Sequence, residues 1–230
     1  MNWWTRFLDF ISPRVCVVCG HRLSPTERSI CGVCLFHLPR TDFYLKPLDN
    51  PMAQLFWKLA NIQKATALFY HQSHSETARI IYRLKYNNRP DIGEDMGHVM
   101  AQELLSTGFF SDIDVLLPVP LSRKRLRQRG YNQSEMLAIG VSDITHLPII
   151  THALQRKDFH QSQTLLNRWQ RQENVAKSFQ LKDGSQLHHK HILLIDDVCT
   201  TGATLAACSN ALKEIEGIRV SVLTLGFTKE

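Results

Sequence analysis

The residues at 192–204 carry the most distinctive chemistry in this sequence, reading Ile-Leu-Leu-Ile-Asp-Asp-Val-Cys-Thr-Thr-Gly-Ala-Thr. An apolar strand here would deliver Asp196 and Asp197 to the carboxyl edge of a sheet, before a Thr- and Gly-rich turn that opens a helix. Free N–H groups at such a helix start, together with hydroxyls, are typical of a phosphate cradle. Two carboxylates would repel that phosphate, so they suit neutral hydroxyls a short distance away. A ribose 5-phosphate has this polarity, whereas the alternative is a tight strand-to-helix turn with an Asp-Asp cap.

A basic segment follows a second apolar strand that ends in Pro118-Val119-Pro120. Five of its seven residues at 123–129 are cationic, namely Arg123, Lys124, Arg125, Arg127 and Arg129. If this segment is a loop at the same sheet edge, its cations can hold an anionic group there. The alternatives are a solvated loop, or a nucleic-acid contact through Arg125, Arg127 and Arg129.

The N-terminal cysteines form two Cys-x-x-Cys pairs, which are Cys16 with Cys19 and Cys31 with Cys34. Each pair can fold into a knuckle that presents two thiolates to one tetrahedral ion. Four cysteines leave no open coordination position, so the ion would be a structural zinc in a tight ribbon. Two disulfides or incidental cysteines are the alternatives. A zinc ion would also stabilise a segment too short to bury much core.

The elements that must position these groups alternate between strands and helices. Apolar spacing predicts strands over 65–70, 114–120, 152–154, 191–197 and 219–227, and helices over 76–86, 91–105, 132–143, 167–179 and 204–215. Strands separated by helices favour a parallel sheet with crossovers. The polar stretch 39–51, with three prolines, is interpreted as a linker. Ahead of the cysteines, apolar residues at helical spacing over 3–11 predict a helix that packs on the domain or docks on a membrane surface.

Composition limits the broad class of the protein. The chain has 230 residues, 43% hydrophobic and 21% charged, which excludes wholesale disorder. Its net charge of +6 suggests an anionic partner such as phosphate or nucleic acid. We expect no membrane span, because no apolar run approaches about 18 residues. The start of the sequence does not look like a secretory signal, so we expect a cytoplasmic protein with reduced cysteines.

The run at 192–204 resembles the phosphoribosyl pyrophosphate (PRPP) motif of type I phosphoribosyltransferases. The resemblance implies that Asp196 and Asp197 are the catalytic pair that binds the ribose 2- and 3-hydroxyls. It also implies a loop that binds the 5-phosphate, made of Thr200, Thr201, Gly202, Ala203 and Thr204. The resemblance further implies a diphosphate loop at Pro118-Val119-Pro120, where Arg123 and Lys124 are the best candidates to hold the leaving group and balance its charge. Purine salvage enzymes of that family place a third Asp where this chain has Thr200, so purine-base salvage is disfavoured. Residue 2 is Asn, so a self-contained glutamine amidotransferase with an N-terminal nucleophilic cysteine is excluded.

The combination of CxxC–CxxC, PVPLSRKRLRQRGYNQS, QxxLxxxxRxxNV and LLIDDVCTTGAT resembles the ComF/GntX group over nearly the whole chain. The implied architecture is an α/β, type I phosphoribosyltransferase-like parallel sheet flanked by helices, with a small N-terminal zinc ribbon. We expect the zinc-ribbon segment with its apolar helix over 1–45 and the phosphoribosyltransferase-like domain over 46–230. The resemblance implies a hood over the site within 161–179.

The same resemblance implies PRPP as ligand, Mg²⁺ bound with PRPP, and a link to natural competence, the uptake of single-stranded DNA. Single-stranded DNA and other competence proteins are the further partners that it suggests. The acceptor of a phosphoribosyl transfer is not defined, so two functions stay open. The chain is either a phosphoribosyltransferase or an inactive PRPP-fold module that binds single-stranded nucleic acid. In the second case, Tyr131, Phe159 and Trp169 are candidates for stacking with bases.

Overall fold

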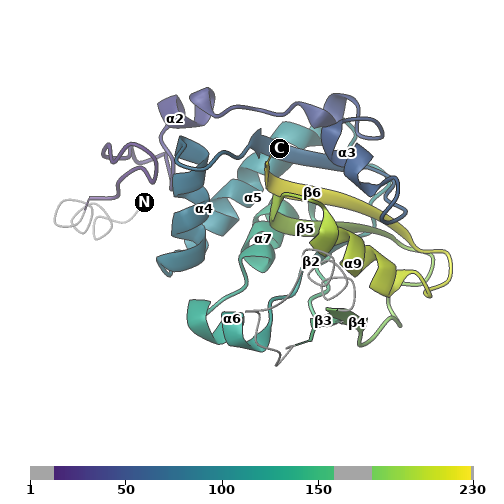
Figure 1. The fold of residues 1–230 in the computed structure, drawn as a ribbon. Coiled ribbons are helices and arrows are strands. Elements are labelled where there is room, and N and C mark those ends of the chain that lie inside the picture. Colours follow the sequence, from purple (N-terminus) through teal and green to yellow (C-terminus); the bar gives the residue numbers. More distant parts are fainter. Residues whose placement is uncertain (1–12, 158–177, 229–230) are drawn as a thin grey trace.

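A four-stranded parallel sheet forms the centre of the protein. The computed structural model describes residues 13–157 and 178–228, and Figure 1 shows their arrangement. The strand order is β1 (Ala65–Tyr70), β6 (Arg219–Phe227), β5 (His191–Cys199) and β2 (Val115–Pro118), with all three pairings parallel. The parallel sheet predicted from the alternation of strands and helices is therefore confirmed. Its carboxyl ends all meet at one edge, where the candidate residues follow the strands.

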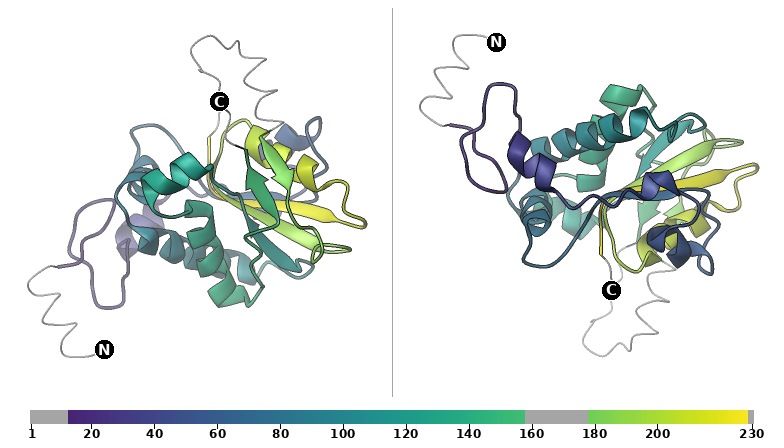
Figure 2. Two further views of the ribbon diagram at one scale, coloured as in Figure 1. Left: turned by 90° about the horizontal axis from the view of Figure 1, so that it is seen from below. Right: turned by 90° about the horizontal axis from the view of Figure 1, so that it is seen from above.

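Helices cover both faces of this sheet, as the two views in Figure 2 show. One face carries α4 (Glu76–Tyr86), α5 (Pro90–Leu105) and α7 (Gln133–Thr145), and the other carries α3 (Pro51–Phe56) and α9 (Ala203–Leu212). Alternate residues of β5 divide between the two cores: Leu193 and Ile195 enter one, and Ile192 and Leu194 the other. A strand buried on both sides reads as a continuous apolar run, which is why the sequence pattern located it.

Most predicted elements occur within one to three residues of their expected bounds. The strand predicted over 152–154 lies two residues further along the chain, as β3 (Leu154–Arg156). It pairs antiparallel with β4 (Phe179–Leu181). The helix predicted over 167–179 is wrong at its end, since Phe179 begins a strand. The rest of that helix and nearly all of the predicted hood lie outside the described residues, as does the predicted helix near the N-terminus.

The basic segment at 123–129 is a helix, α6 (Arg123–Arg129), and the prediction of a loop is wrong. Ser122 caps its start by accepting the N–H of Arg125 at 3.3 Å, and Gly130 ends it in the left-handed region at φ 80°. Arg, Lys, Leu and Gln all favour helix, so a capped run of seven such residues is stable as one short helix. None of its side chains is buried.

The stretch 39–51 is packed against the sheet, so its interpretation as a linker is wrong. It contains the short helix η1 (Phe43–Leu45), and both Phe43 and Asn50 are buried. Asn50 accepts the N–H groups of Met52 and Ala53, which caps α3, and donates to the carbonyl of Ala65 at 2.9 Å. Pro51 is the first residue of α3, a position that proline tolerates, and the carbonyls of Pro39 and Pro47 accept N–H groups of Tyr70 and Ala65 of β1.

The cysteine segment lies against the helices of the larger sheet domain. It contains α2 (Gly32–His37), and its buried side chains share one hydrophobic cluster with α4 and α5. Arg79 of α4 donates to the carbonyl of Val18 at 2.8 Å, and Ser29 donates to Asp95 of α5. The domain division at residue 45 stays a prediction. Within the described ranges, no helix is long and apolar enough to cross a bilayer.

Candidate functional site

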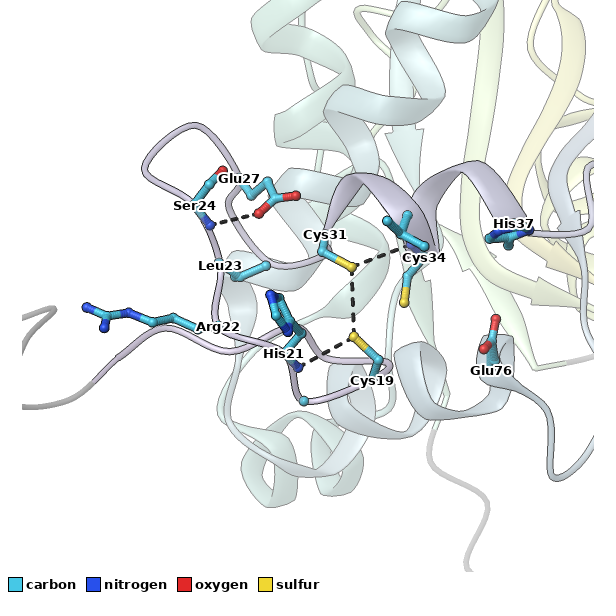
Figure 3. Close-up of a pocket in the computed structure, with 12 residues that line it drawn as sticks. Cys19, His21, Arg22, Leu23, Ser24, Glu27, Cys31, Cys34, His37 and Glu76 are labelled. Atoms are coloured by element: carbon cyan, nitrogen blue, oxygen red, sulfur yellow. Dashed lines mark hydrogen bonds between the residues drawn. The ribbon is translucent and has the colours of Figure 1, made fainter.

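The four thiols predicted to bind metal converge on one point. The sulfur atoms of Cys16, Cys19, Cys31 and Cys34 all lie within 4.8 Å of one another. A tetrahedral ion with metal–sulfur bonds of about 2.3 Å needs sulfurs about 3.8 Å apart, and Cys19 and Cys31 have that 3.8 Å separation. All four cysteines are free thiols, so no disulfide joins them, contrary to the alternative of two disulfides. Figure 3 shows three of these side chains turned toward each other beside a pocket.

Backbone N–H groups already point at the cysteine sulfurs. Cys31 N donates to Cys16 Sγ at 3.3 Å, His21 N to Cys19 Sγ at 3.4 Å, and Cys34 N to Cys31 Sγ at 3.5 Å. Burial works against ionisation of Cys16, yet N–H donors of Cys19, Cys31 and Val18 outweigh it and lower the pKa of this thiol to about 7. Such donors stabilise the Cys16 thiolate, the form that ligates a metal, whereas burial raises the pKa of the Cys34 thiol. The cluster therefore has the donors, spacing and surrounding bonds of a structural metal site.

The acidic pair lies at the carboxyl edge of the sheet, as the sequence pattern predicted. Burial, followed by the neighbouring charge of Asp197, raises the pKa of Asp196 to about 7. Two groups hold the Asp196 carboxylate in place: Ser134 Oγ and the backbone N–H of Asp197 both donate to its Oδ1 at 2.9 Å. Ser134 stands in the first turn of α7, so this helix start fixes the orientation of Asp196.

Lys85 is a site residue that sequence reasoning missed. Its Nζ lies 3.0 Å from Asp197 Oδ2, and the two side chains are 22% and 13% exposed. Lys85 stands in the last turn of α4, far from Asp197 in the sequence, so no local motif links them. Within the described residues, Asp196 Oδ2 and Asp197 Oδ1 have no hydrogen-bonding partner. Each carboxylate therefore keeps an oxygen for a ligand, while one charge of the pair is already balanced.

The turn after the acidic pair has the form expected of an anion site. Gly202 adopts φ 74° at the start of α9, and a Cβ there would lie 3.0 Å from Phe56 Cε1. Among the residues that the structure describes, no side chain caps this helix, so its first N–H groups are left for solvent or a ligand. Thr200 and Thr201 are exposed, and Ala203 and Thr204 are half-buried. Cys199 is buried behind the turn, and burial raises its pKa to about 12, which makes it an inert thiol.

The end of β2 lies directly beside the acidic strand. Pro118 is in register with Ile195, and Val119 N donates to the Ile195 carbonyl at 2.9 Å. Asn132 joins this turn to α7, because its side chain donates to the Val119 carbonyl at 3.1 Å and also caps the helix. The segment predicted to hold diphosphate therefore leaves the sheet next to Asp196.

The five predicted cations stand on α6, on the far side of that turn. Arg123, Lys124, Arg125 and Arg127 are exposed, and no contact joins Arg123 or Lys124 to the acidic pair within the described residues. Arg129 instead lies over the ring of Tyr86, with Cζ 5.5 Å from the ring centroid. Because Tyr86 follows Lys85, the end of α4 connects the basic helix to the acidic pair. The predicted role of Arg123 and Lys124 with diphosphate stays a prediction.

Comparison with protein-family models gives no match. Among curated proteins, the chain is 35% identical over 221 residues to "Competence protein ComFC" of Bacillus subtilis, covering 93% of this chain and 84% of that protein. It is 27% identical over 206 residues to "DNA utilization protein YhgH" of Escherichia coli O157:H7, covering 86% of this chain and 83% of that protein. "Competence protein F" of Haemophilus influenzae is 26% identical over 140 residues, covering 59% and 61%.

Among solved structures, the chain is similar to a glutamine PRPP amidotransferase from B. subtilis at 19% identity and a TM-score of 0.41. That match covers 61% of this chain and 30% of the other, so the chain spans less than a third of that enzyme. An adenine phosphoribosyltransferase from Leishmania tarentolae is 12% identical with a TM-score of 0.37, covering 77% and 88%.

Proposed function

The chain belongs to the ComF family, and from that premise we propose that it is a PRPP-binding, phosphoribosyltransferase-like protein that acts in DNA uptake. One observation carries the proposal: a pair of carboxylates, one of them paired with Lys85, and an uncapped helix start stand together at the carboxyl edge of the sheet. In this arrangement Asp196 and Asp197 accept from the ribose 2- and 3-hydroxyls. The N–H groups and hydroxyls over 200–204 receive the 5-phosphate.

The diphosphate of PRPP then lies toward the turn after β2, which begins beside Asp196. Mg²⁺ would come with PRPP and be held largely by substrate oxygens and water, with the free carboxylate oxygens of the acidic pair as protein ligands. The ion would neutralise charge on the departing diphosphate. Lys85 supports ribose binding by holding Asp197 through one oxygen and adding a positive charge beside an anionic ligand.

Transfer of the phosphoribosyl group needs an acceptor, and the described site has no carboxylate where purine salvage enzymes place one. Thr200 occupies that position and is exposed. A hydroxyl cannot handle the proton on a purine nitrogen as a carboxylate does. We therefore propose either an acceptor that needs no such base, or binding of PRPP without turnover.

The cysteine cluster is proposed to hold one structural zinc ion per chain. The four sulfurs and their N–H donors fit a closed tetrahedral site. With no open position, such an ion would stabilise the segment against α4 and α5 and take no part in the transfer chemistry.

A second proposed activity is the binding of single-stranded nucleic acid, with α6 as the contact. Relatives carry the names "Competence protein ComFC" and "DNA utilization protein YhgH". The observation that favours this activity is that five of the seven α6 residues are basic, and none of its side chains is buried. Arg125, Arg127 and Arg129 would contact phosphates. Other competence proteins remain proposed partners.

Calorimetry with three ligands tests the PRPP proposal. We expect purified protein in Mg²⁺ to bind PRPP more tightly than either ribose 5-phosphate or diphosphate, because PRPP alone fills both halves of the site. Diphosphate release against a panel of acceptors, with and without single-stranded DNA, then separates turnover from binding. No measurable PRPP binding would refute the proposal. Equal affinity for PRPP and diphosphate would refute the roles of the acidic pair and of the turn over 200–204.

A further inference from the structure

Two tyrosines of α4 form an exposed aromatic surface that no part of the ribose site uses. Tyr82 is 60% exposed and Tyr86 is 63% exposed, although aromatic rings usually bury most of their area. They stand one helical turn apart, with ring centroids 5.0 Å apart and planes inclined at 42°. We call Tyr82 and Tyr86 the tyrosine pair. Two large rings in contact make a continuous patch, which differs from a single apolar residue on a surface.

The basic helix α6 lies next to this patch. Arg129 places its guanidinium over Tyr86 at 5.5 Å, and Tyr131 donates its hydroxyl to the carbonyl of Leu84. These two contacts hold the end of α6 and the turn after it against the last turn of α4. Figure 1 shows α6 at the lower left, below the end of α4. The exposed rings and the exposed cations therefore belong to one side of the molecule.

The free positive charge beside the tyrosine pair comes from α6. On α4 and just after it, Lys85 is paired with Asp197 and Arg89 with Asp91. Within the described residues no carboxylate pairs with the five α6 cations, and 115–134 contains no aspartate or glutamate. Such a helix attracts a polyanion. A polyanion that also presents flat aromatic groups uses both properties of the surface.

We propose that the tyrosine pair is a nucleobase-stacking platform, and that a single strand of nucleic acid binds with its bases on these rings and its phosphates on α6. This inference rests on the nucleic-acid binding proposed above and adds where the bases are held. Stacking tolerates any sequence, because every base has a flat face. An acidic peptide would satisfy the cations and leave the ring faces unused, so charge complementarity together with exposed rings favours a nucleic-acid strand.

The platform differs from the aromatic residues that the sequence suggested. Tyr131 is half-buried, and its hydroxyl is bonded to Leu84, so it supports the junction between the helices. Phe159 and Trp169 lie outside the described residues. Tyr82 and Tyr86 fall at a helical spacing that also suits a buried face, which is why the sequence alone did not single them out.

Binding of a labelled oligothymidylate, measured by fluorescence anisotropy over a range of salt, tests the platform. We expect the double variant Tyr82→Ala/Tyr86→Ala to lose roughly tenfold or more in affinity, as removal of base–aromatic stacking does, with the salt dependence unchanged. Tyr82→Phe/Tyr86→Phe should bind as the parent does, because the ring faces remain. Trp57→Ala removes a 66% exposed aromatic side chain next to α3, away from α6 in Figure 1, and should change nothing.

Two further binding measurements separate the contribution of base stacking from that of phosphate contacts. Arg125→Gln/Arg127→Gln should reduce the slope of log affinity against log salt by roughly 0.7 for each phosphate that is no longer neutralised, and this variant leaves Arg129 in place over Tyr86. An abasic oligonucleotide of the same length should bind the parent protein as weakly as oligothymidylate binds the alanine variant. The alanine variant should not distinguish the two strands.

The possible outcomes test the stacking platform separately from the nucleic-acid binding by α6 on which it rests. If the parent protein binds no oligonucleotide, both the nucleic-acid activity and the platform are refuted. If α6 substitutions weaken binding but the alanine variant binds as the parent does, only the platform is refuted. If a polyglutamate peptide binds as tightly as the oligonucleotide and depends on the tyrosines, the surface takes acidic peptides and the platform is also refuted. None of these results bears on PRPP binding.

Discussion

The cysteine cluster and the acidic edge of the sheet are assembled in opposite ways. The four thiols come from nineteen consecutive residues, 16–34, and their sulfurs already lie at metal-binding distances with N–H donors in place. The acidic edge takes its groups from β5, α4 and α7, and oxygens of both carboxylates are left without partners in the described chain. A closed site stabilises structure, whereas an open one with unsatisfied groups is suited to a ligand. The experiments below test that contrast from the larger expected effect to the smaller.

Loss of one cysteine should have the largest effect, on stability. A structural zinc contributes on the order of 10 kcal/mol to folding of a small segment. Cys31→Ser removes a sulfur at the centre of the cluster, so we expect loss of zinc by elemental analysis and loss of hydrogen-exchange protection over 14–37. Cys208→Ser is the matched control, a buried cysteine outside the cluster, and should keep the metal. A Cys31→Ser protein that retains one zinc per chain would contradict the closed site.

The free energy of unfolding should decrease as pH rises, because Asp196 at the acidic edge loses its proton. The pKa of Asp196 is raised to about 7, so the folded state holds this proton more tightly than the unfolded chain does. The resulting stabilisation is complete below the unfolded pKa and is lost between about pH 4 and pH 7, by at most about 4 kcal/mol. Asp196→Asn should flatten this part of the pH profile in denaturant titrations. It should therefore be more stable than the parent at pH 8.

Asp183→Asn provides the opposite case. The N–H of Ser185 lowers the pKa of the exposed Asp183 carboxyl, so its stabilisation is present above the unfolded pKa and disappears as pH falls. The free energy of unfolding of Asp183→Asn should therefore fall below that of the parent at neutral pH. Asp196→Asn should change it in the opposite direction. If the free energy of unfolding changes in the same direction in both variants, the raised pKa of Asp196 is contradicted.

Removal of both carboxylates should abolish the ribose contacts and leave the fold intact. We expect Asp196→Asn/Asp197→Asn to weaken PRPP binding about 100-fold, or about 3 kcal/mol, with a similar loss for ribose 5-phosphate and little change for diphosphate. Asp143→Asn, at the other end of α7 from Ser134, is the control. Calorimetry that gives unchanged PRPP affinity in the double variant would rule out the acidic pair as the diol site.

Lys85 should matter less than the carboxylates, because it acts through Asp197 and by its charge. We expect Lys85→Met to weaken PRPP binding about tenfold, or about 1.4 kcal/mol. Arg83→Met removes a cation from the same helix two residues earlier, on a different side of α4 from Lys85, and should change affinity little. Tighter PRPP binding by Lys85→Met would mean that the ammonium blocks the site in the free protein, contrary to the proposed role.

The sequence was sufficient for much of this organisation because the relevant patterns are local. Ligand spacing in Cys-x-x-Cys pairs depends on one turn of backbone, so the metal cluster was predictable from residues 16–34. The strand β5 is buried on both faces, which makes it a continuous apolar run that stands out in the sequence. Asp196 and Asp197 follow that run directly, and their place at the carboxyl edge follows from the direction of the strand.

Only the tertiary structure decided which distant residues join those motifs. Lys85 meets Asp197 because α4 ends at the carboxyl edge of the sheet, and Ser134 meets Asp196 because α7 begins there. The contact of Arg129 with Tyr86 likewise requires α6 to be a helix beside α4. Residue types and spacings determine local conformation and short-range ligand sets. The crossing of helices over a sheet depends on packing of the whole core, so the partners of a charged group far along the chain appear only in the folded molecule.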